Sequence, residues 1–152
     1  AILGGGTTTA FLAHGLDWAS IYPEENVELA KRIVSAGGLL LSEYSIEEKI
    51  NRYQLVARDR LQAGLSNGTI VIQTGKKGGT MHAVNATIMA GKPLFAVEFT
   101  KDEDLKDQKV QGNLMLFEEK KAAPINSKNI DSVKEVLLKR PIDNPRQQTL
   151  FE

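Results

Sequence analysis

Short runs of branched apolar residues alternate with amphipathic, helix-like stretches along most of this 152-residue chain. The predicted strands cover residues 8–13, 39–42, 69–73, 94–98 and 124–126. The first predicted helix begins within residues 22–26. The other predicted helices cover residues 53–65, 80–90, 112–121 and 130–139. This alternation is typical of an open parallel sheet. We therefore expect an α/β fold of three layers, with a mostly parallel sheet, helices on both faces and right-handed crossovers.

Apolar residues at helical spacing mark the helix faces that we expect to be buried. They are Ala30, Ile33 and Val34, then Ala57, Leu61 and Leu65, then Met81, Val84 and Ile88, and finally Ile130, Val133, Val136 and Leu137. Residues 39–42 do not alternate in polarity, which predicts a strand that is buried on both faces. We expect a mobile surface loop at residues 101–111 and a polar C-terminal tail at residues 141–152.

The formal net charge is zero, because 19 basic residues balance 19 acidic ones. This balance excludes a protein that holds nucleic acid or a membrane surface by bulk charge, although a local basic patch is compatible with it. Cysteine is absent, which excludes disulfides, thiol chemistry and cysteine zinc sites. The apolar runs are far shorter than the roughly 18 residues of a membrane span. We expect a cytoplasmic protein with neither a signal peptide nor a membrane partner.

The strongest local signal is the segment TIVIQTGKKGGT, which ends at Thr80. It leads from a buried strand into a helix N-terminus, where free N–H groups and the helix dipole attract an anion, at the edge where parallel sheets bind ligands. Gly78 and Gly79 permit close approach of a phosphate. Thr80 can cap the helix or donate its hydroxyl, and Lys76 and Lys77 add positive charge. The segment is not a Walker A loop. The alternative is a tight turn with solvated lysines.

Arg58, Asp59 and Arg60 form the second candidate site. The two arginines point about 200° apart on a helix, and one or both are expected to reach a phosphate at the sheet edge. The alternative is a charged helix surface on which Asp59 screens both arginines. Glu43 and Glu98 each end a predicted strand. Two carboxylates at strand ends can act as an acid/base pair. Because no clear nucleophile stands beside them, a structural role is favoured, in which Glu43 holds an arginine in place.

His14 and His82 are the only histidines, which is too few to predict a metal site, and no cofactor is predicted. His82 falls in the first turn of the helix after the glycine segment, where it is a candidate contact for a phosphate or a base. His14 is expected to support the end of a strand.

Several segments resemble, in order, the DNA-processing protein A family, which is also called Smf. They are AFLAHGLD ending at Asp17, YPEEN, SEY around Glu43, RDRLQAGLS from Arg58, the glycine segment ending at Thr80, and GKPLFAV. Together they extend over roughly residues 5–139. The resemblance implies a Rossmann-like domain over residues 1–140 that lacks its first strands.

The resemblance also implies a function. It implies a homodimer that binds single-stranded DNA in a basic pocket and loads a RecA-type recombinase during natural transformation, without an established catalytic reaction. Arg58, Arg60 and residues 76–80 would line the pocket, and Glu43 and Asp17 would support it. A short basic groove can follow the backbone of a single strand while the rest of the protein stays neutral.

The chain departs from the family pattern at several positions. Leu55-Val56 replaces Phe-Pro, Asp59 replaces asparagine, Gly78 replaces serine, and Glu98-Phe99 replaces Pro-Gly. The family's Gly-Ser-Arg segment would precede Ala1, so we expect a divergent or N-terminally incomplete member.

One alternative is a nucleotide-binding sensor or a phosphoribohydrolase-like protein, although Ala83 stands where that group has its catalytic glutamate. Another is a protein that kept the scaffold and lost DNA binding.

Overall fold

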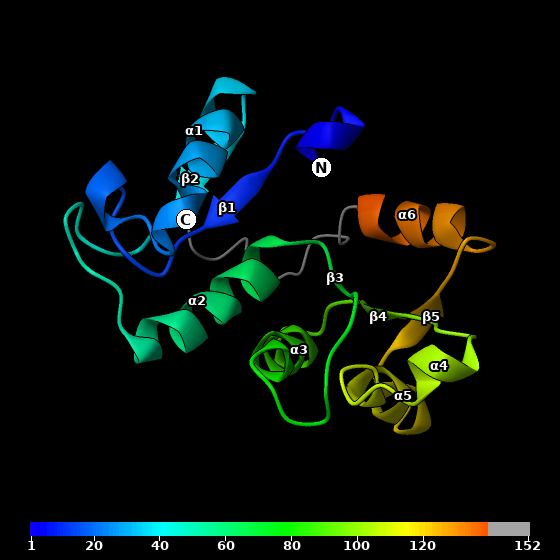
Figure 1. Cartoon of the computed structure of the whole chain (residues 1–152). Helices are drawn as coiled ribbons and strands as arrows, with labels where there is room; N and C mark the ends of the chain where they lie inside the picture. Colours follow the sequence, from blue (N-terminus) through cyan, green and yellow to red (C-terminus); the bar gives the residue numbers. More distant parts are fainter. Residues whose placement is uncertain (140–152) are drawn as a thin grey trace, which may run out of the picture. The chain divides into compact units, whose positions relative to one another are not determined.

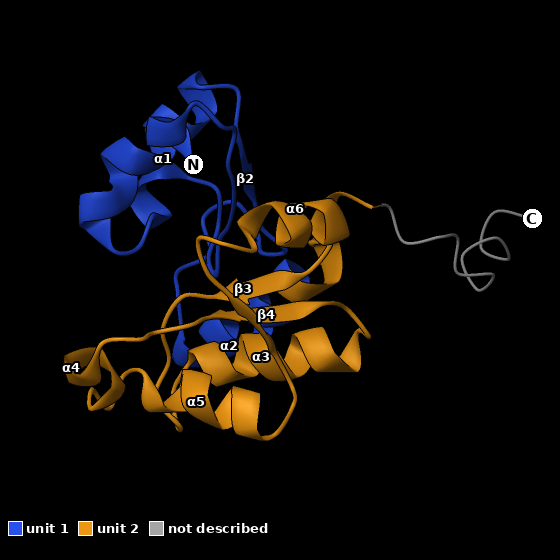
Figure 2. Ribbon diagram, turned by 90° about the vertical axis from the view of Figure 1, so that its right-hand side faces the viewer, with its two compact units in different colours: residues 1–62 blue, residues 63–152 orange. Residues whose placement is uncertain are grey.

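The computed structural model describes residues 1–139 as a chain of helices and parallel strands (Figure 1). It divides into two compact units, unit 1 at Ala1–Gln62 and unit 2 from Ala63 onward (Figure 2). The long helix α2 (Arg52–Leu65) crosses the boundary between them. The predicted tail at residues 141–152 lies outside the described residues.

Unit 1 is built around a two-stranded parallel sheet. Its elements are η1 (Ile2–Gly4), β1 (Thr9–Phe11), η2 (Trp18–Ser20), η3 (Glu24–Asn26), α1 (Val27–Ser35), β2 (Leu39–Leu41) and most of α2. Ala10 of β1 lies opposite Leu40 of β2. Helix α1 connects the strands and buries Ala30 and Ile33. The helix is followed by Gly37 at a φ of 77°, a left-handed conformation that glycine adopts without strain.

Two expectations for unit 1 are wrong. Leu39 is 51% exposed, so β2 is not buried on both faces, and Val34 of α1 is 47% exposed. A two-stranded sheet is narrow, and side chains on successive strand residues point to opposite faces. Helix α1 therefore covers only part of this sheet, through Ala30 and Ile33. Val34 on the flank of the helix and Leu39 of β2 stay exposed to solvent.

Unit 2 contains a three-stranded parallel sheet in the order β3-β4-β5. Its elements are β3 (Thr69–Val71), α3 (Thr80–Met89), β4 (Leu94–Val97), α4 (Asp102–Leu105), α5 (Gln111–Glu118), β5 (Ala123–Ile125) and α6 (Ile130–Leu138). Phe95 of β4 pairs with Ile70 on one side and Ala123 on the other. The last strand, β5, lies at the edge of this sheet.

Both faces of this sheet are covered by helices (Figure 2). On one face, Leu94 and Ala96 of β4 pack with Val71, with Val84 of α3 and with Leu116 of α5. On the other face, Phe95 packs with Ile125 and with Val133 of α6. The alternation along β4 thus creates two apolar layers, and the predicted parallel α/β fold with helices on both faces is confirmed.

The predicted loop at residues 101–111 is wrong in part, because it contains the short helix α4.

Four residues that were expected to be buried are at least 41% exposed: Leu65, Ile88, Ile130 and Val136. A strand of four residues is only about 13 Å long. The sheet therefore contacts little more than two turns of each helix, and apolar residues near the helix ends or flanks are left uncovered.

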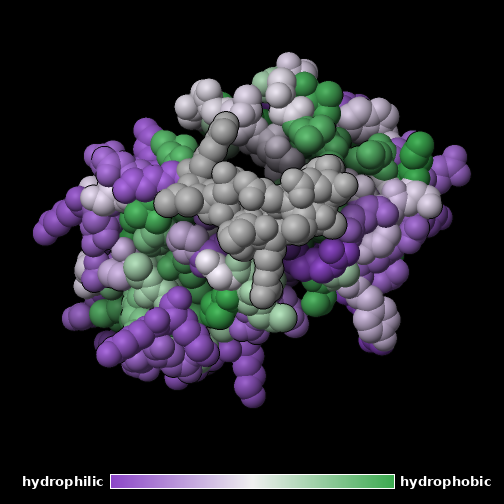
Figure 3. Space-filling view, turned by 180° about the vertical axis from the view of Figure 1, so that it is seen from behind, coloured by the Kyte–Doolittle hydropathy of each residue, from purple (hydrophilic) through white to green (hydrophobic). Residues whose placement is uncertain are grey.

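Exposed apolar side chains are scattered among hydrophilic ones, as the separate green groups in Figure 3 show. Met89 at the end of α3 is the most exposed of those in unit 2, at 88%. Within residues 1–139, no helix has the length and apolar character that crossing a bilayer requires.

Lys92 stabilises the C-terminal end of α2, which lies in unit 2. Its Nζ donates to the backbone oxygens of Gly64 and Ser66, at 2.5 and 2.6 Å. The last carbonyl groups of a helix have no partner within the helix, and they carry the negative end of its dipole. A cation that binds the carbonyl of Gly64 at the end of α2 and that of Ser66 just after it therefore closes the turn between α2 and β3.

We expect Lys92→Met to lower the free energy of unfolding by roughly 1–2 kcal/mol, because it removes both charge-assisted hydrogen bonds. Urea denaturation measures this change. Lys134→Met is the matched control, because Lys134 is exposed on α6 and makes no ion pair within residues 1–139. Equal stability of the two variants would contradict the assigned role of Lys92.

Candidate functional site

The glycine segment lies where the sequence places it, between the carboxyl end of β3 and the N-terminus of α3. Because β3 and β4 are parallel, this loop emerges at the same sheet edge as the chain that follows β4. Ligands of open parallel sheets bind at this edge. The predicted position of the loop is therefore confirmed.

The first residue of the loop, Thr74, is held tightly by α5. Its N–H donates to Oδ1 of Asn113 at 2.9 Å, and its carbonyl accepts from the N–H of Gly112 at 2.8 Å. Gly112 must be glycine here, because a Cβ atom at this position would lie 2.5 Å from the carbonyl oxygen of Gly75. Thr74 and Asn113 are both buried. The base of the loop is thus part of the core of unit 2.

The tip of the loop, by contrast, is open. Lys76, Lys77, Gly78, Gly79 and Thr80 are all exposed. A Cβ atom on Gly78 or Gly79 would meet nothing within 4 Å, and neither glycine has a positive φ. Neither backbone conformation nor packing within the protein therefore requires glycine at these two positions. Their effect is to leave the backbone accessible to an approaching ligand.

The start of α3 has unused donors. The N–H groups of Met81 and His82 donate to the carbonyl oxygens of Gly78 and Gly79. The N–H groups of Gly79 and Thr80 make no hydrogen bond within residues 1–139. Gly79 occupies the N-cap position and no side chain caps the helix, so the expectation that Thr80 caps it is wrong. Because Thr80 is already the first helical residue, its hydroxyl stays free for a ligand.

His82 lies in the first turn of α3, as expected, and it is exposed. It therefore faces solvent close to the free N–H groups of the loop. Its predicted contact with a phosphate or a base stays a prediction.

Arg58 and Arg60 of α2 are each paired with a different carboxylate. Nη2 of Arg58 lies 3.3 Å from Oδ1 of Asp59, and Nη2 of Arg60 lies 2.5 Å from Oε2 of Glu43. The arrangement in which Asp59 screens both arginines is therefore wrong. Glu43, at the end of β2, holds Arg60 in place, which confirms one of its two predicted roles. Asp59 is buried, whereas Arg60 is largely exposed.

His14 supports the end of β1, as expected. It is 2% exposed, its Nε2 accepts from the N–H of Tyr22, and its Nδ1 donates to the carbonyl of Gly15. Asp17 has a local role, because its carboxylate accepts from the N–H of Ala19 at the start of η2. Both residues thus shape the chain after β1.

The predicted site draws on both units. Glu43, Arg58 and Arg60 belong to unit 1, whereas the loop at residues 76–80 belongs to unit 2. Each group of residues is arranged locally as described above. Their convergence on one pocket stays a prediction.

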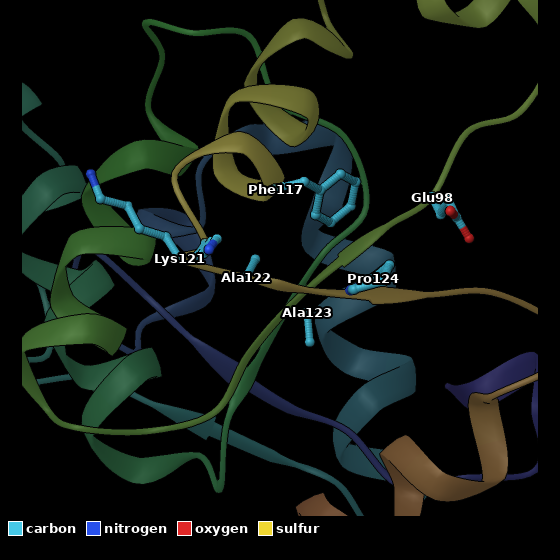
Figure 4. A pocket seen from close by; sticks show the side chains of 7 residues that line it. Glu98, Phe117, Lys121, Ala122, Ala123 and Pro124 are labelled. Carbon is cyan, nitrogen blue, oxygen red and sulfur yellow. The ribbon is translucent and has the colours of Figure 1, made fainter.

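The second strand-end carboxylate, Glu98, accepts a hydrogen bond from Nδ2 of Asn126. It lines an open pocket of about 440 Å³ in unit 2, with Phe117, Lys121 and Pro124 (Figure 4). Figure 4 shows Glu98 and Lys121 at opposite ends of this pocket. No other predicted site residue lines it.

Sequence reasoning missed Asn113 and Gly112, which hold the base of the loop. The available signal is a polar side chain between a glycine and the apolar run LMLF, at a position that proves fully buried. A buried amide needs partners for its donors and its acceptor, so such an asparagine indicates a local hydrogen-bond network. Its partners are 16 to 41 residues away in sequence.

Known proteins resemble this chain over most of its length. A model of the DNA recombination-mediator protein A family matches residues 1–137. The Smf protein of Synechocystis is 42% identical over 97 residues, which are 64% of this chain. DNA processing protein A of Helicobacter pylori, whose structure concerns a unique single-stranded DNA binding mode, has 28% identity and a TM-score of 0.71. DprA of Streptococcus pneumoniae has 26% identity and a TM-score of 0.74.

The chain spans only part of these relatives. The two structural matches cover 84% and 94% of this chain, but 56% and 46% of the solved chains. The matched segments are 21 to 37% of the lengths of the curated relatives. The activities and partners of the full-length relatives can therefore enter only as proposals.

Gly79 and Gly112 should respond oppositely to an added methyl group. Gly79→Ala is expected to leave the free energy of unfolding unchanged or to raise it by up to about 1 kcal/mol, because its backbone is helical and its surroundings are open. Gly112→Ala should lower it by roughly 1–3 kcal/mol through overpacking against Thr74 and Gly75. Urea denaturation of both variants tests this difference. An equal loss in both would mean that Gly79 also packs against the protein.

Proposed function

The chain belongs to the DNA recombination-mediator protein A family, and from this premise we propose that it binds single-stranded DNA through residues 76–80 and through Arg58 and Arg60. The backbone and lysines of residues 76–80 contact phosphates, and Arg58 and Arg60 supply further phosphate contacts. The relative from Helicobacter pylori, which binds single-stranded DNA, supports this proposal.

The observation that carries the proposal is the contrast between the base and the tip of the glycine loop. The base is buried and hydrogen-bonded, whereas the tip presents two free N–H groups, two lysines and two glycines in open surroundings. Free N–H groups at a helix N-terminus favour an anionic ligand, and a fixed base reduces the entropy lost on binding. A phosphate of a nucleic acid backbone meets these requirements.

The zero net charge fits a narrow binding path better than a broad basic surface. Two of the proposed cations, Arg58 and Arg60, are already neutralised by Asp59 and Glu43. A phosphate that approaches Arg60 competes with Glu43 for a side chain that is 61% exposed. Among the proposed cations, only Lys76 and Lys77 make no ion pair within residues 1–139, which makes the loop the primary electrostatic contact.

Several finer properties follow from the family and belong to the same proposal. The protein acts in DNA processing during natural transformation, as a homodimer that loads a RecA-type recombinase in the cytoplasm. Its role is binding rather than catalysis. Residues 1–140 supply the family's DNA-binding domain, and His82 and Asp17 contribute as contact and support.

We expect a labelled oligothymidylate to bind in a salt-dependent way, and Lys77→Ala and Arg60→Ala each to weaken binding. Each lost phosphate contact should reduce the slope of log K against log salt by about 0.7 for a single strand. Fluorescence anisotropy at several salt concentrations measures both quantities. Lys134→Ala is the control for a change of net charge outside the proposed path.

The proposal fails if the wild-type protein shows no binding at low salt, or binding that is insensitive to salt. Unchanged affinity in both variants would instead remove the site assignment and leave DNA binding intact. A thermal-shift measurement with mononucleotides distinguishes the remaining alternative. Stabilisation by mononucleotides without oligonucleotide binding would indicate a nucleotide-binding protein.

Asp59→Asn should strengthen binding of single-stranded DNA by roughly 2- to 10-fold, because it removes a negative charge beside Arg58 and releases the guanidinium for a phosphate. Glu43→Gln is the matched variant at Arg60. Affinities are compared at a temperature where both variants are folded, as shown by circular dichroism. Weaker binding by folded Asp59→Asn would indicate that Asp59 orients Arg58 rather than opposing the ligand.

A further inference from the structure

Asn113 links the carboxyl ends of two neighbouring strands to the glycine loop. Its side chain is 0% exposed. Nδ2 donates to the carbonyl oxygens of Ile72, just after β3, and of Val97, the last residue of β4, both at 3.0 Å. Oδ1 accepts from the N–H of Thr74 at 2.9 Å. One carboxamide thus satisfies three backbone groups at the edge where the sheet presents its loops.

This combination of partners selects an amide side chain. Two carbonyl oxygens need donors and one N–H needs an acceptor, within reach of a single short side chain. Asparagine offers two donors and an acceptor, whereas an ionised aspartate only accepts and an apolar side chain does neither. Because the site is buried, water cannot replace the missing partner without entering the core.

The network fixes the direction in which the loop leaves the sheet. Thr74 is held on its N–H side by Asn113 and on its carbonyl side by Gly112. At the other end of the loop, Gly78 and Gly79 accept hydrogen bonds from the first turn of α3. The exposed residues between these two anchors have no other hydrogen bond to the rest of unit 2 among the described residues. Their conformation therefore depends on the anchors.

We propose that Asn113 is a positioning residue for the anion-binding tip of the loop, residues 76–80. It touches no ligand itself. By fixing Thr74 and both strand ends, it holds the free N–H groups of Gly79 and Thr80 in place before a phosphate arrives, which reduces the entropy cost of binding. This inference rests on the proposed binding of single-stranded DNA, but it also predicts a property of the free protein.

A buried asparagine can also serve stability alone, and the test has to separate the two roles. Thr87 supplies a matched control in the same unit. Its side chain is 0% exposed, its Oγ1 donates to the carbonyl of Ala83, and it lies 2.7 Å from Oγ1 of Thr69. Thr87→Val therefore breaks buried hydrogen bonds at the opposite end of β3 without touching the loop.

The test measures oligothymidylate affinity against salt for Asn113→Ala and Thr87→Val, at a temperature where both are folded. We expect Asn113→Ala to bind the oligonucleotide roughly 10-fold more weakly. The slope of log K against log salt should decrease in magnitude by about 0.7 or more, because at least one phosphate contact is lost. Thr87→Val should keep the wild-type slope. Equal effects of the two variants, or a wild-type slope in Asn113→Ala, would overturn the inference.

A second measurement needs no DNA. Amide NMR of the free protein should show changed chemical shifts and lower order parameters at Gly78 and Gly79 in Asn113→Ala, and wild-type values in Thr87→Val. Unchanged loop signals overturn the positioning role even if DNA binding is confirmed. Changed signals support it even if the wild-type protein fails to bind DNA, which would overturn the proposed function alone. If Asn113→Ala does not fold, Asn113→Ser, which keeps one hydroxyl donor, takes its place.

Discussion

The burial of β4 on both faces is the constraint on which the rest of unit 2 depends. Leu94 and Ala96 pack toward α3 and α5, and Phe95 packs toward α6. A strand that is apolar on both sides has to lie between two helical layers, and its parallel neighbours then place their carboxyl ends at one edge. The glycine loop and Asn113 meet at this edge because α5 is held against the same face as α3.

The candidate site combines a rigid base with an accessible tip. Hydrogen bonds to Thr74 and the close approach of Gly112 fix the base, whereas Gly78 and Gly79 at the tip have open surroundings. This division explains why the glycines at the base and at the tip have different physical requirements. Gly112 is needed for packing, and the tip glycines leave room for a ligand.

The sequence predicted the strands, the main helices and the glycine loop well, because apolar periodicity and glycine placement are local signals. It predicted burial less well. Leu39 and Val34 are exposed because short strands and a narrow sheet cover little of each element, and a sequence pattern does not report sheet width. The Asn113 network also escaped prediction, since its partners are distant in sequence. That Glu43 holds an arginine is one of its two predicted roles, but the sequence does not indicate that the arginine is Arg60.

Local charge pairing reconciles the neutral composition with an anionic ligand. Arg58 and Arg60 are balanced by Asp59 and Glu43, and Lys76 and Lys77 supply the unpaired positive charge of the proposed site. The most direct test of the account is an NMR titration of the protein with oligothymidylate. We predict that the amide signals of Gly78, Gly79 and Thr80 shift most strongly within unit 2, and that added salt reverses the shifts. Shifts in unit 2 that spare these three residues would contradict the account.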